Sequence, residues 1–202
     1  DAQESRGLGD VYKRQHPLYI DDEYASYTSS DLLDVCNNSK VVAIGECGLD
    51  FYREYSTKYE QINCFEHHLC LASDTKKPLF LHERDAFKNF YDMLKNHCDD
   101  LQNFVVHCFT GNKSNLKKYL DLGAYIGLTG WLTDPNRGSH LKDIIKFIPH
   151  DRIMIETDAP YLIPHNINFK HDGTNQPAYL PYVAEAVACL LYTSDAADEG
   201  LG

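Results

Sequence analysis

The sequence predicts an α/β fold, namely a (β/α)8 TIM-type barrel that is truncated at its N-terminus. Short apolar runs alternate with longer amphipathic stretches along the chain. This alternation is typical of βαβ units, in which helices connect the strands of a parallel sheet. Several of the apolar runs lead into a Glu, His or Asp residue. Polar residues at the carboxyl ends of parallel barrel strands are where such folds build active sites.

Strands are expected where short apolar runs are continuous, because such runs are typical of strands buried on both faces. The expected strands cover residues 41–45, 78–82, 103–107, 124–128 and 152–156. A complete barrel has eight strands and about 250 residues, whereas this chain has 202 residues. We therefore expect the C-terminal portion of a longer barrel, without its first two strands and part of the third.

Helices are expected between the strands, where apolar residues recur every three to four positions. In residues 57–75, for example, Phe65, Leu69 and Ala72 fall on one face. The other expected helices cover residues 85–98, 113–121, 139–147 and 178–191.

The two ends of the chain differ from this pattern. Residues 1–15 show no helical or strand periodicity, and residues 192–202 follow a good helix with small and acidic residues. We interpret both as segments foreign to the domain, with ordinary disordered termini as the alternative. The predicted domain is therefore residues 16–191.

Composition narrows the class of protein. The formal net charge of -11 argues against a tight binder of extended duplex nucleic acid. An enzyme that holds a few phosphates through a metal and local Arg residues remains possible. Seven scattered cysteines without a C-x-x-C pair suggest reduced thiols and a cytoplasmic protein. No apolar stretch approaches the roughly 18 residues of a membrane span.

Four residues of metal-binding type follow apolar runs: Glu46, His82, His107 and Asp158. Parallel strands place their carboxyl ends at one rim, so these side chains are expected to lie together. Carboxylates and imidazoles suit Mg, Mn or Zn, and the set is large enough for one or two ions. A divalent ion can lower the pKa of an attacking water and neutralise charge on a phosphate.

Five segments also resemble a known family. They read VVAIGECGLDFYRE, PLFLHERDA, VVHCFTGN, YIGLTGW and IMIETDAPYLIP, in that order along the chain. Their sequence, order and spacing are similar to those of the TatD family of metal-dependent deoxyribonucleases, within the amidohydrolase-like hydrolases. The resemblance implies an eight-fold barrel with one or two divalent ions at the strand ends.

The resemblance also implies roles for individual residues. Glu46, His82 and His107 would bind metal, and Asp158 would be a ligand or the general base. His16, in a His-Pro pair, matches a family active-site histidine. The predicted catalytic residues are thus His16, Glu46 and Asp158.

Three further residues are candidates for substrate binding. Arg84 follows His82 by two positions and could hold a phosphate, although an ion pair with Asp50 or Asp85 is an alternative. Arg137 is a second candidate phosphate ligand or a solvated loop charge. Trp131 could stack on an unpaired base or pack within its loop.

These observations predict a metal-dependent nuclease, specifically a 3′→5′ exonuclease on single-stranded DNA or another nucleic acid. One alternative is a related hydrolase of an ester or amide, such as a D-aminoacyl-tRNA deacylase, since a metal site alone does not define the bond cleaved. The other is an inactive fragment, because missing strands would leave sheet edges exposed. Oligomeric state is left open.

Overall fold

The computed structural model describes residues 16–17, 20, 29–53 and 55–199, so the proposed foreign leader, residues 1–15, lies outside the described residues. The chain forms two compact units. The described residues up to His107, together with 121–124, make up the first unit. Residues 108–120 and those from Tyr125 onward make up the second.

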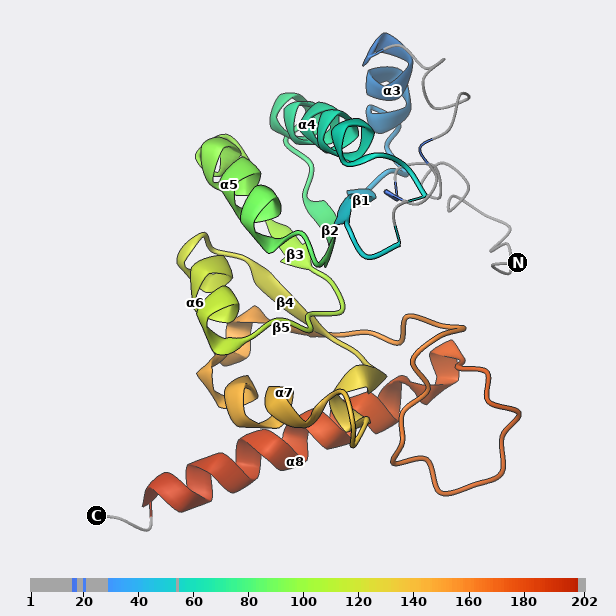
Figure 1. Ribbon diagram of the computed structural model, residues 1–202, viewed down its shortest axis with the longest axis vertical. Helices are drawn as coiled ribbons and strands as arrows, with labels where there is room; N and C mark the ends of the chain where they lie inside the picture. The colour runs from blue at the N-terminus through green and yellow to red at the C-terminus, as the bar shows by residue number, and fades with distance from the viewer. Residues whose placement is uncertain (1–15, 18–19, 21–28, 54, 200–202) are drawn as a thin grey trace. The chain divides into compact units, whose positions relative to one another are not determined.

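The first unit is built on three parallel strands (Figure 1). These are β1 (Ile44–Asp50), β2 (Leu79–Arg84) and β3 (Phe104–Val106). β2 pairs with both β1 and β3, and the register of β1 against β2 shifts between Gly45 and Cys47. The strands therefore run in the same direction, as βαβ units require.

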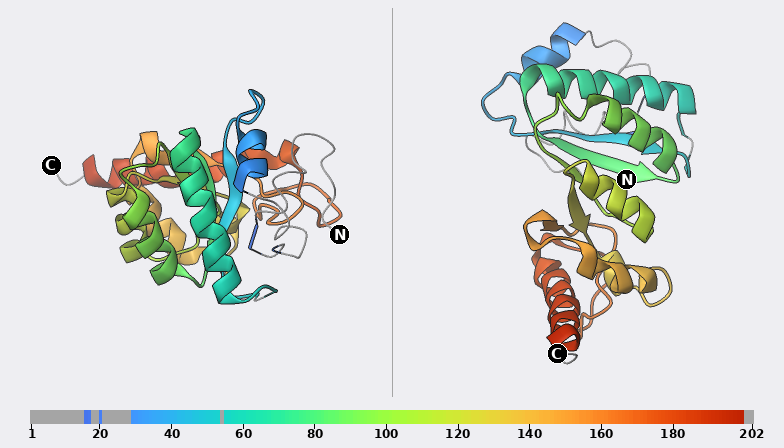
Figure 2. Two further views of the ribbon diagram at one scale, coloured as in Figure 1. Left: turned by 90° about the horizontal axis from the view of Figure 1, so that it is seen from above. Right: turned by 90° about the vertical axis from the view of Figure 1, so that its left-hand side faces the viewer.

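Helices α4 (Lys58–Thr75) and α5 (Phe87–His97) lie side by side along β1 and β2 (Figures 1 and 2). A capping box formed by Thr57 and Glu60 begins α4 and satisfies backbone N–H groups of its first turn. The predicted inner face of α4 is confirmed, since Phe65, Leu69 and Ala72 are fully buried, and α5 fully buries Phe90 and Leu94. Helix α3 (Ser29–Cys36), which the sequence reading did not predict, lies beside α4.

The second unit contains the parallel pair β4 (Tyr125–Leu128) and β5 (Ile153–Ile155). Helix α6 (Lys113–Asp121) precedes β4, and α7 (Ser139–Ile144) lies between the two strands in sequence. The long helix α8 (Leu180–Glu199) packs against β5 and against short 3-10 turns. The 3-10 turns of this unit are η1 (Gly130–Thr133), η2 (Ile145–Phe147), η3 (His150–Arg152) and η4 (Pro177–Tyr179), and α8 packs against η1, η2 and η4.

The predicted α/β class is confirmed, and each of the five expected strands is present. The described residues contain no further strand. β1 and β2 extend beyond their predicted ends at residues 45 and 82, because GECGLD and HER continue the parallel pairing after the apolar runs stop.

Two expectations about packing and length were wrong. β5 was expected to be buried on both faces, but Met154 is 47% and Ile155 37% exposed. Its one strand partner among the described residues is β4, so one edge of β5 carries no neighbouring strand. The last helix also continues past residue 191, since the Ala, Asp and Glu residues up to Glu199 are compatible with a helix. The interpretation of residues 192–202 as a foreign tail stays a prediction.

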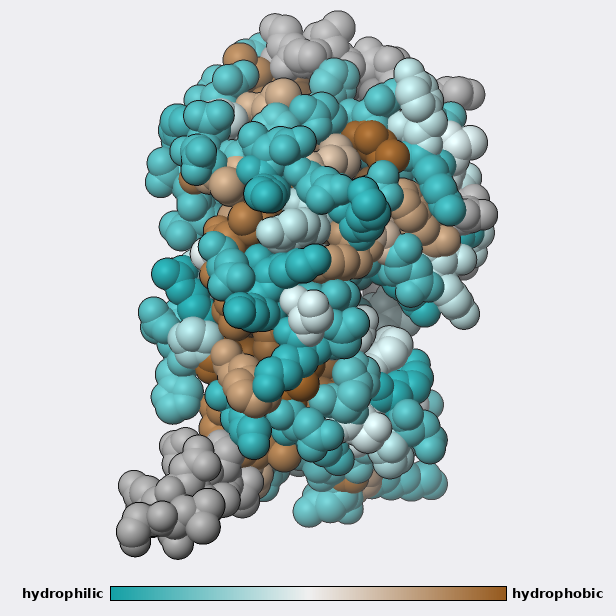
Figure 3. Space-filling view, turned by 60° about the vertical axis from the view of Figure 1, so that its left-hand side comes forward, coloured by the Kyte–Doolittle hydropathy of each residue, from teal (hydrophilic) through white to brown (hydrophobic). Residues whose placement is uncertain are grey.

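The outer surface is mainly hydrophilic on the face that Figure 3 shows, with hydrophobic residues visible in the gaps between polar ones. Within the described residues, every helix is too short or too polar to cross a bilayer.

Candidate metal centre

β1 supplies the acidic residue at the centre of the site. Glu46 lies within β1 rather than after it, next to the point where the register against β2 shifts. Across the pair, β2 supplies His82, and His107 follows the last residue of β3. The first unit therefore brings three of the four predicted ligands together on neighbouring parallel strands.

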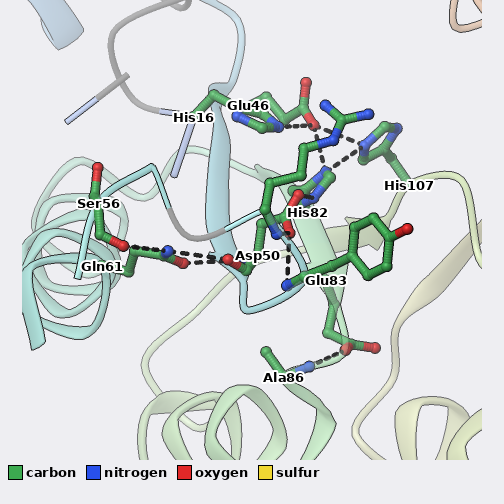
Figure 4. Close-up of polar contacts among 11 residues, drawn as sticks. His16, Glu46, Asp50, Ser56, Gln61, His82, Glu83, Ala86 and His107 are labelled. Atoms are coloured by element: carbon green, nitrogen blue, oxygen red, sulfur yellow. Dashed lines mark hydrogen bonds and ion pairs between the residues drawn. The ribbon is translucent and has the colours of Figure 1, made fainter. Parts of the chain in front are cut away.

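Three imidazoles surround one carboxylate oxygen of Glu46 (Figure 4). The Oε1 atom lies 2.7 Å from Nε2 of His107, 2.9 Å from Nδ1 of His82 and 3.3 Å from Nε2 of His16. His82 Nδ1 is also 3.2 Å from His107 Nε2. The structure thus brings His16 together with three of the four predicted ligands, Glu46, His82 and His107.

The surroundings perturb the protonation of these groups. Burial alone would raise the pKa of Glu46, but the charges and hydrogen bonds of His107, His16 and His82 hold it well below its usual value. Burial lowers the pKa of His16. Burial also opposes the charged form of His82, yet its contacts with Asp50 and Glu46 raise its pKa overall. The centre therefore keeps Glu46 ionised among the imidazoles.

The donor set fits a divalent cation. Ligand atoms of His16, Glu46 and His82 lie within 4.8 Å of one another, which a single ion could bridge. Imidazole nitrogens with a carboxylate oxygen are ligands for Zn or Mn, and carboxylates also suit Mg. An ionised, half-buried carboxylate in contact with several imidazoles is the arrangement expected of such a site.

Asp50 was not predicted as a site residue. It is fully buried, and its Oδ2 lies 3.2 Å from Nε2 of His82. Asp50 stands four positions after Glu46, and alternate residues of a strand share a face. That spacing was the signal that could have indicated it.

The second unit contains the fourth predicted ligand. Asp158 follows β5 by three residues, has a left-handed backbone φ of 55° and is half-buried. Its carbonyl accepts a hydrogen bond from the Tyr161 N–H. The role of Asp158 as ligand or general base stays a prediction.

Glu156 is a second residue that the sequence reading missed. Its carboxylate accepts a hydrogen bond of 2.6 Å from the N–H of Cys108. Cys108 has a φ of 44°, a left-handed conformation that costs energy in a non-glycine residue. Glu156 therefore holds the backbone of Cys108, the residue that follows the predicted ligand His107 in the chain.

The three substrate-binding candidates have different surroundings. Arg84 is half-buried, and its guanidinium lies 4.0 Å from the ring centroid of the exposed Tyr52. Among the described residues, neither of the alternative partners Asp50 and Asp85 forms an ion pair with Arg84. The Arg84 side chain therefore carries no carboxylate partner within this part of the chain.

Trp131 and Arg137 belong to one turn of the second unit. The Arg137 guanidinium lies 4.3 Å from the Trp131 ring centroid, and Trp131 Nε1 donates to the Arg137 carbonyl. Asp134 accepts hydrogen bonds from the Arg137 N–H, the Arg137 side chain and the Asn136 N–H, which lowers the pKa of Asp134 to about 2. The turn thus holds an arginine against one face of an indole.

A parallel α/β fold that gathers a carboxylate and imidazoles on neighbouring strands is typical of metal-dependent hydrolases of the α/β-barrel class. The chain belongs to the TatD related DNase family, whose model matches residues 15–197.

Two named exonucleases are similar to this chain in amino-acid sequence. The 3′-5′ ssDNA/RNA exonuclease TatD of Salmonella typhimurium is 40% identical over 174 residues, which is 86% of this chain. The enzyme of the same name from a Rahnella species is 49% identical over 149 residues, or 73% of this chain. The chain spans 66% and 57% of the lengths of these two relatives.

Two solved structures share the fold. A TatD family hydrolase from Entamoeba histolytica gives a TM-score of 0.76 at 27% identity, covering 88% of this chain and 66% of that one. A TatD homologue from Escherichia coli K12 gives a TM-score of 0.72 at 27% identity, covering 87% and 66%.

Proposed function

We propose that this chain carries the metal centre of a nuclease that hydrolyses phosphodiester bonds, acting from the 3′ end of single-stranded DNA or RNA. The observation that carries the proposal is the gathering of His16, His82 and His107 around Glu46 in a chain of the TatD related DNase family. Relatives of the same family bear the name 3′-5′ ssDNA/RNA exonuclease.

In this proposal one divalent ion, Mg, Mn or Zn, is held by Glu46, His82, His107 and His16. A second ion would need further ligands. A bound divalent ion would acidify the attacking water and offset the negative charge of the phosphate. Glu46 contributes the negative charge that attracts the cation, and the neutral imidazoles contribute directed lone pairs. Burial of the cluster limits competition from bulk water.

The remaining candidates act on the substrate. Asp158 accepts the proton of the attacking water, as a carboxylate general base. Arg84 binds a phosphate oxygen through its guanidinium, which has no carboxylate partner among the described residues. Trp131 stacks on a terminal base, while Arg137, which is ion-paired with Asp134, covers the other face of the indole and offers its remaining N–H groups to a phosphate.

The test is hydrolysis of a 5′-labelled single-stranded oligonucleotide with and without Mg or Mn. Glu46→Gln keeps the size of the side chain but removes the charge, and we expect its turnover to fall at least about a hundredfold. Glu185→Gln is the matched control, because Glu185 is exposed on α8. A ladder shortening from the 3′ end only with metal would support the proposal.

Two other results would replace the proposal. A protein that binds Mn and cleaves an aminoacyl ester or an amide, but releases no nucleotide, would be a hydrolase of another bond. A protein that binds no metal and cleaves neither substrate would be an inactive fragment. Equal activity of Glu46→Gln and the unmodified chain would remove the metal centre from the mechanism.

We also propose a reducing, cytoplasmic location. The seven cysteines are all free of disulfide bonds, and proteins of oxidising compartments usually pair theirs. Secretion of the protein in its native host with oxidised thiols would contradict this.

A further inference from the structure

Asp50 is a buried carboxylate with a separate set of donors at each oxygen (Figure 4). Its Oδ1 accepts hydrogen bonds of 3.0 Å from the backbone N–H groups of Tyr52 and Arg53. Its Oδ2 lies 3.2 Å from Nε2 of His82. The two backbone donors fix the orientation of the carboxylate, so that Oδ2 faces the imidazole.

Gln61, from the first turn of α4, fixes the backbone of the same residue. The Gln61 side chain is fully buried, and its Oε1 accepts a hydrogen bond of 2.8 Å from the Asp50 N–H. Its Nε2 donates to the Asp50 carbonyl at 2.9 Å and to the Ser56 carbonyl at 3.1 Å. One side-chain amide thus holds Asp50 at both its N–H and its carbonyl (Figure 4).

This arrangement selects a tautomer of His82. An ionised carboxylate can only accept hydrogen bonds, so its contact with Nε2 requires the proton to be on Nε2. A neutral imidazole with its proton on Nε2 has its lone pair on Nδ1. The Nδ1 atom faces Glu46 Oε1 at 2.9 Å and His107 Nε2 at 3.2 Å, so a proton on Nδ1 can donate to the Glu46 carboxylate. A cation held by Glu46 would displace that proton, whereas the proton on Nε2 would stay in its hydrogen bond to Asp50.

We propose that Asp50, held by Gln61, is a positioning residue that keeps the proton of His82 on Nε2 and presents Nδ1 as the metal-binding atom. Histidine ligands commonly donate their second N–H to a carboxylate, which orients the ring and makes the ligand more basic. The inference rests on the proposed function, because it takes His82 to be a metal ligand.

Asp50→Asn tests the inference. An asparagine has a single acceptor oxygen, and the two backbone N–H groups of Tyr52 and Arg53 would hold it. Its NH2 group would then face Nε2 of His82 and favour the tautomer with the proton on Nδ1. We expect the Zn²⁺ dissociation constant, measured by calorimetry, to rise roughly ten- to a hundredfold.

Asp85→Asn is the matched control. Asp85 is exposed, follows β2 directly and has a φ of 52°, which asparagine tolerates. We expect its Zn²⁺ dissociation constant to stay within about twofold of the unmodified chain, as for a surface substitution away from the site.

A direct measurement needs no variant. In the ¹⁵N spectrum of the zinc-bound chain with labelled histidines, His82 should show a protonated Nε2 and a coordinated Nδ1. A coordinated Nε2 would overturn the inference and leave the proposed function standing, and so would an unchanged Zn²⁺ affinity of a folded Asp50→Asn variant. Failure of the unmodified chain to bind Zn²⁺, Mn²⁺ or Mg²⁺ would overturn both.

Discussion

Gly48 of β1 lies directly against the backbone of His82 in β2: a β-carbon built at Gly48 would stand 2.0 Å from the His82 carbonyl oxygen. The two residues are register partners in the parallel pair. The φ of Gly48 is +145°, a conformation that side-chain-bearing residues rarely adopt. The absence of a side chain at Gly48 therefore sets how closely β1 approaches the strand that carries a predicted ligand.

We expect Gly48→Ala to destabilise the protein by more than about 4 kcal/mol, because a backbone atom rather than a flexible side chain occupies the space. Gly123→Ala is the control, since Gly123 also has a positive φ, of +83°, but an added β-carbon would meet nothing within 4 Å. The control should cost about 1 kcal/mol in conformational strain. Urea unfolding measures both, and equal losses would show that the close approach is unimportant.

The stability of the protein should decrease as pH falls from about 6.5 toward 4. His68 is fully buried in α4, and its Nδ1 donates to the Cys64 carbonyl at 2.7 Å. Burial lowers the pKa of His68 from 6.5 to about 4. Below pH 6.5 the unfolded chain therefore binds a proton that the folded chain excludes. The pKa difference corresponds to about 3 kcal/mol, lost progressively until the folded pKa is reached.

His68→Gln should flatten the stability profile between pH 6.5 and pH 4, whatever its effect at neutral pH. The adjacent His67→Gln is the matched control, because His67 lies on the exposed face of the same helix. Unfolding in urea at a series of pH values measures both variants. A pH dependence that survives in His68→Gln would assign it to other groups.

The part of the fold that could be predicted depends on local pattern. The helix expected over residues 57–75 is α4 almost to the residue, because its apolar positions and its capping box both lie within one stretch of sequence. Helix α3 is short, so its eight residues gave too few repeats of the period to identify it.

The site residues that could be predicted are those whose residue type and position after an apolar run indicate metal binding. Glu46, His82 and His107 were recognised because each follows an apolar run, and the structure brings them together. Asp50 and Gln61 were missed because their roles follow from the register of β1 against β2 and from the packing of α4. Both features join residues that are distant in sequence, and no periodic pattern encodes them.

The capping box of α4 should stabilise the first turn of the helix, which carries Gln61. Thr57 Oγ1 accepts a hydrogen bond from the Glu60 N–H, and the Glu60 carboxylate accepts one from the Thr57 N–H at 2.7 Å. The Thr57 carbonyl accepts from the Gln61 N–H, so the first turn holds the residue that contacts Asp50. We expect Thr57→Ala to cost about 1 kcal/mol.

Thr57→Ser keeps the hydroxyl and should recover most of the loss. Thermal unfolding monitored by circular dichroism compares the two variants under the same conditions. If serine and alanine were equally destabilising, the methyl group of Thr57 would be the stabilising feature and not the cap.

Arg84 should act on substrate binding more than on turnover. Its guanidinium lies over the Tyr52 ring without a carboxylate partner among the described residues, which leaves its N–H groups available to a phosphate. A charge-assisted hydrogen bond contributes about 1.5–3 kcal/mol, so Arg84→Ala should raise KM for a single-stranded oligonucleotide by roughly tenfold or more. Loss of one phosphate contact should also reduce the slope of log affinity against log salt by about 0.7.

Lys88→Ala, which removes a positive charge from an exposed side chain of α5, is the control and should change neither KM nor the salt dependence. A fall in kcat at constant KM and constant salt dependence would instead mean that Arg84 acts on the transition state and not on the bound substrate, because only an interaction absent from the ground state lowers kcat alone.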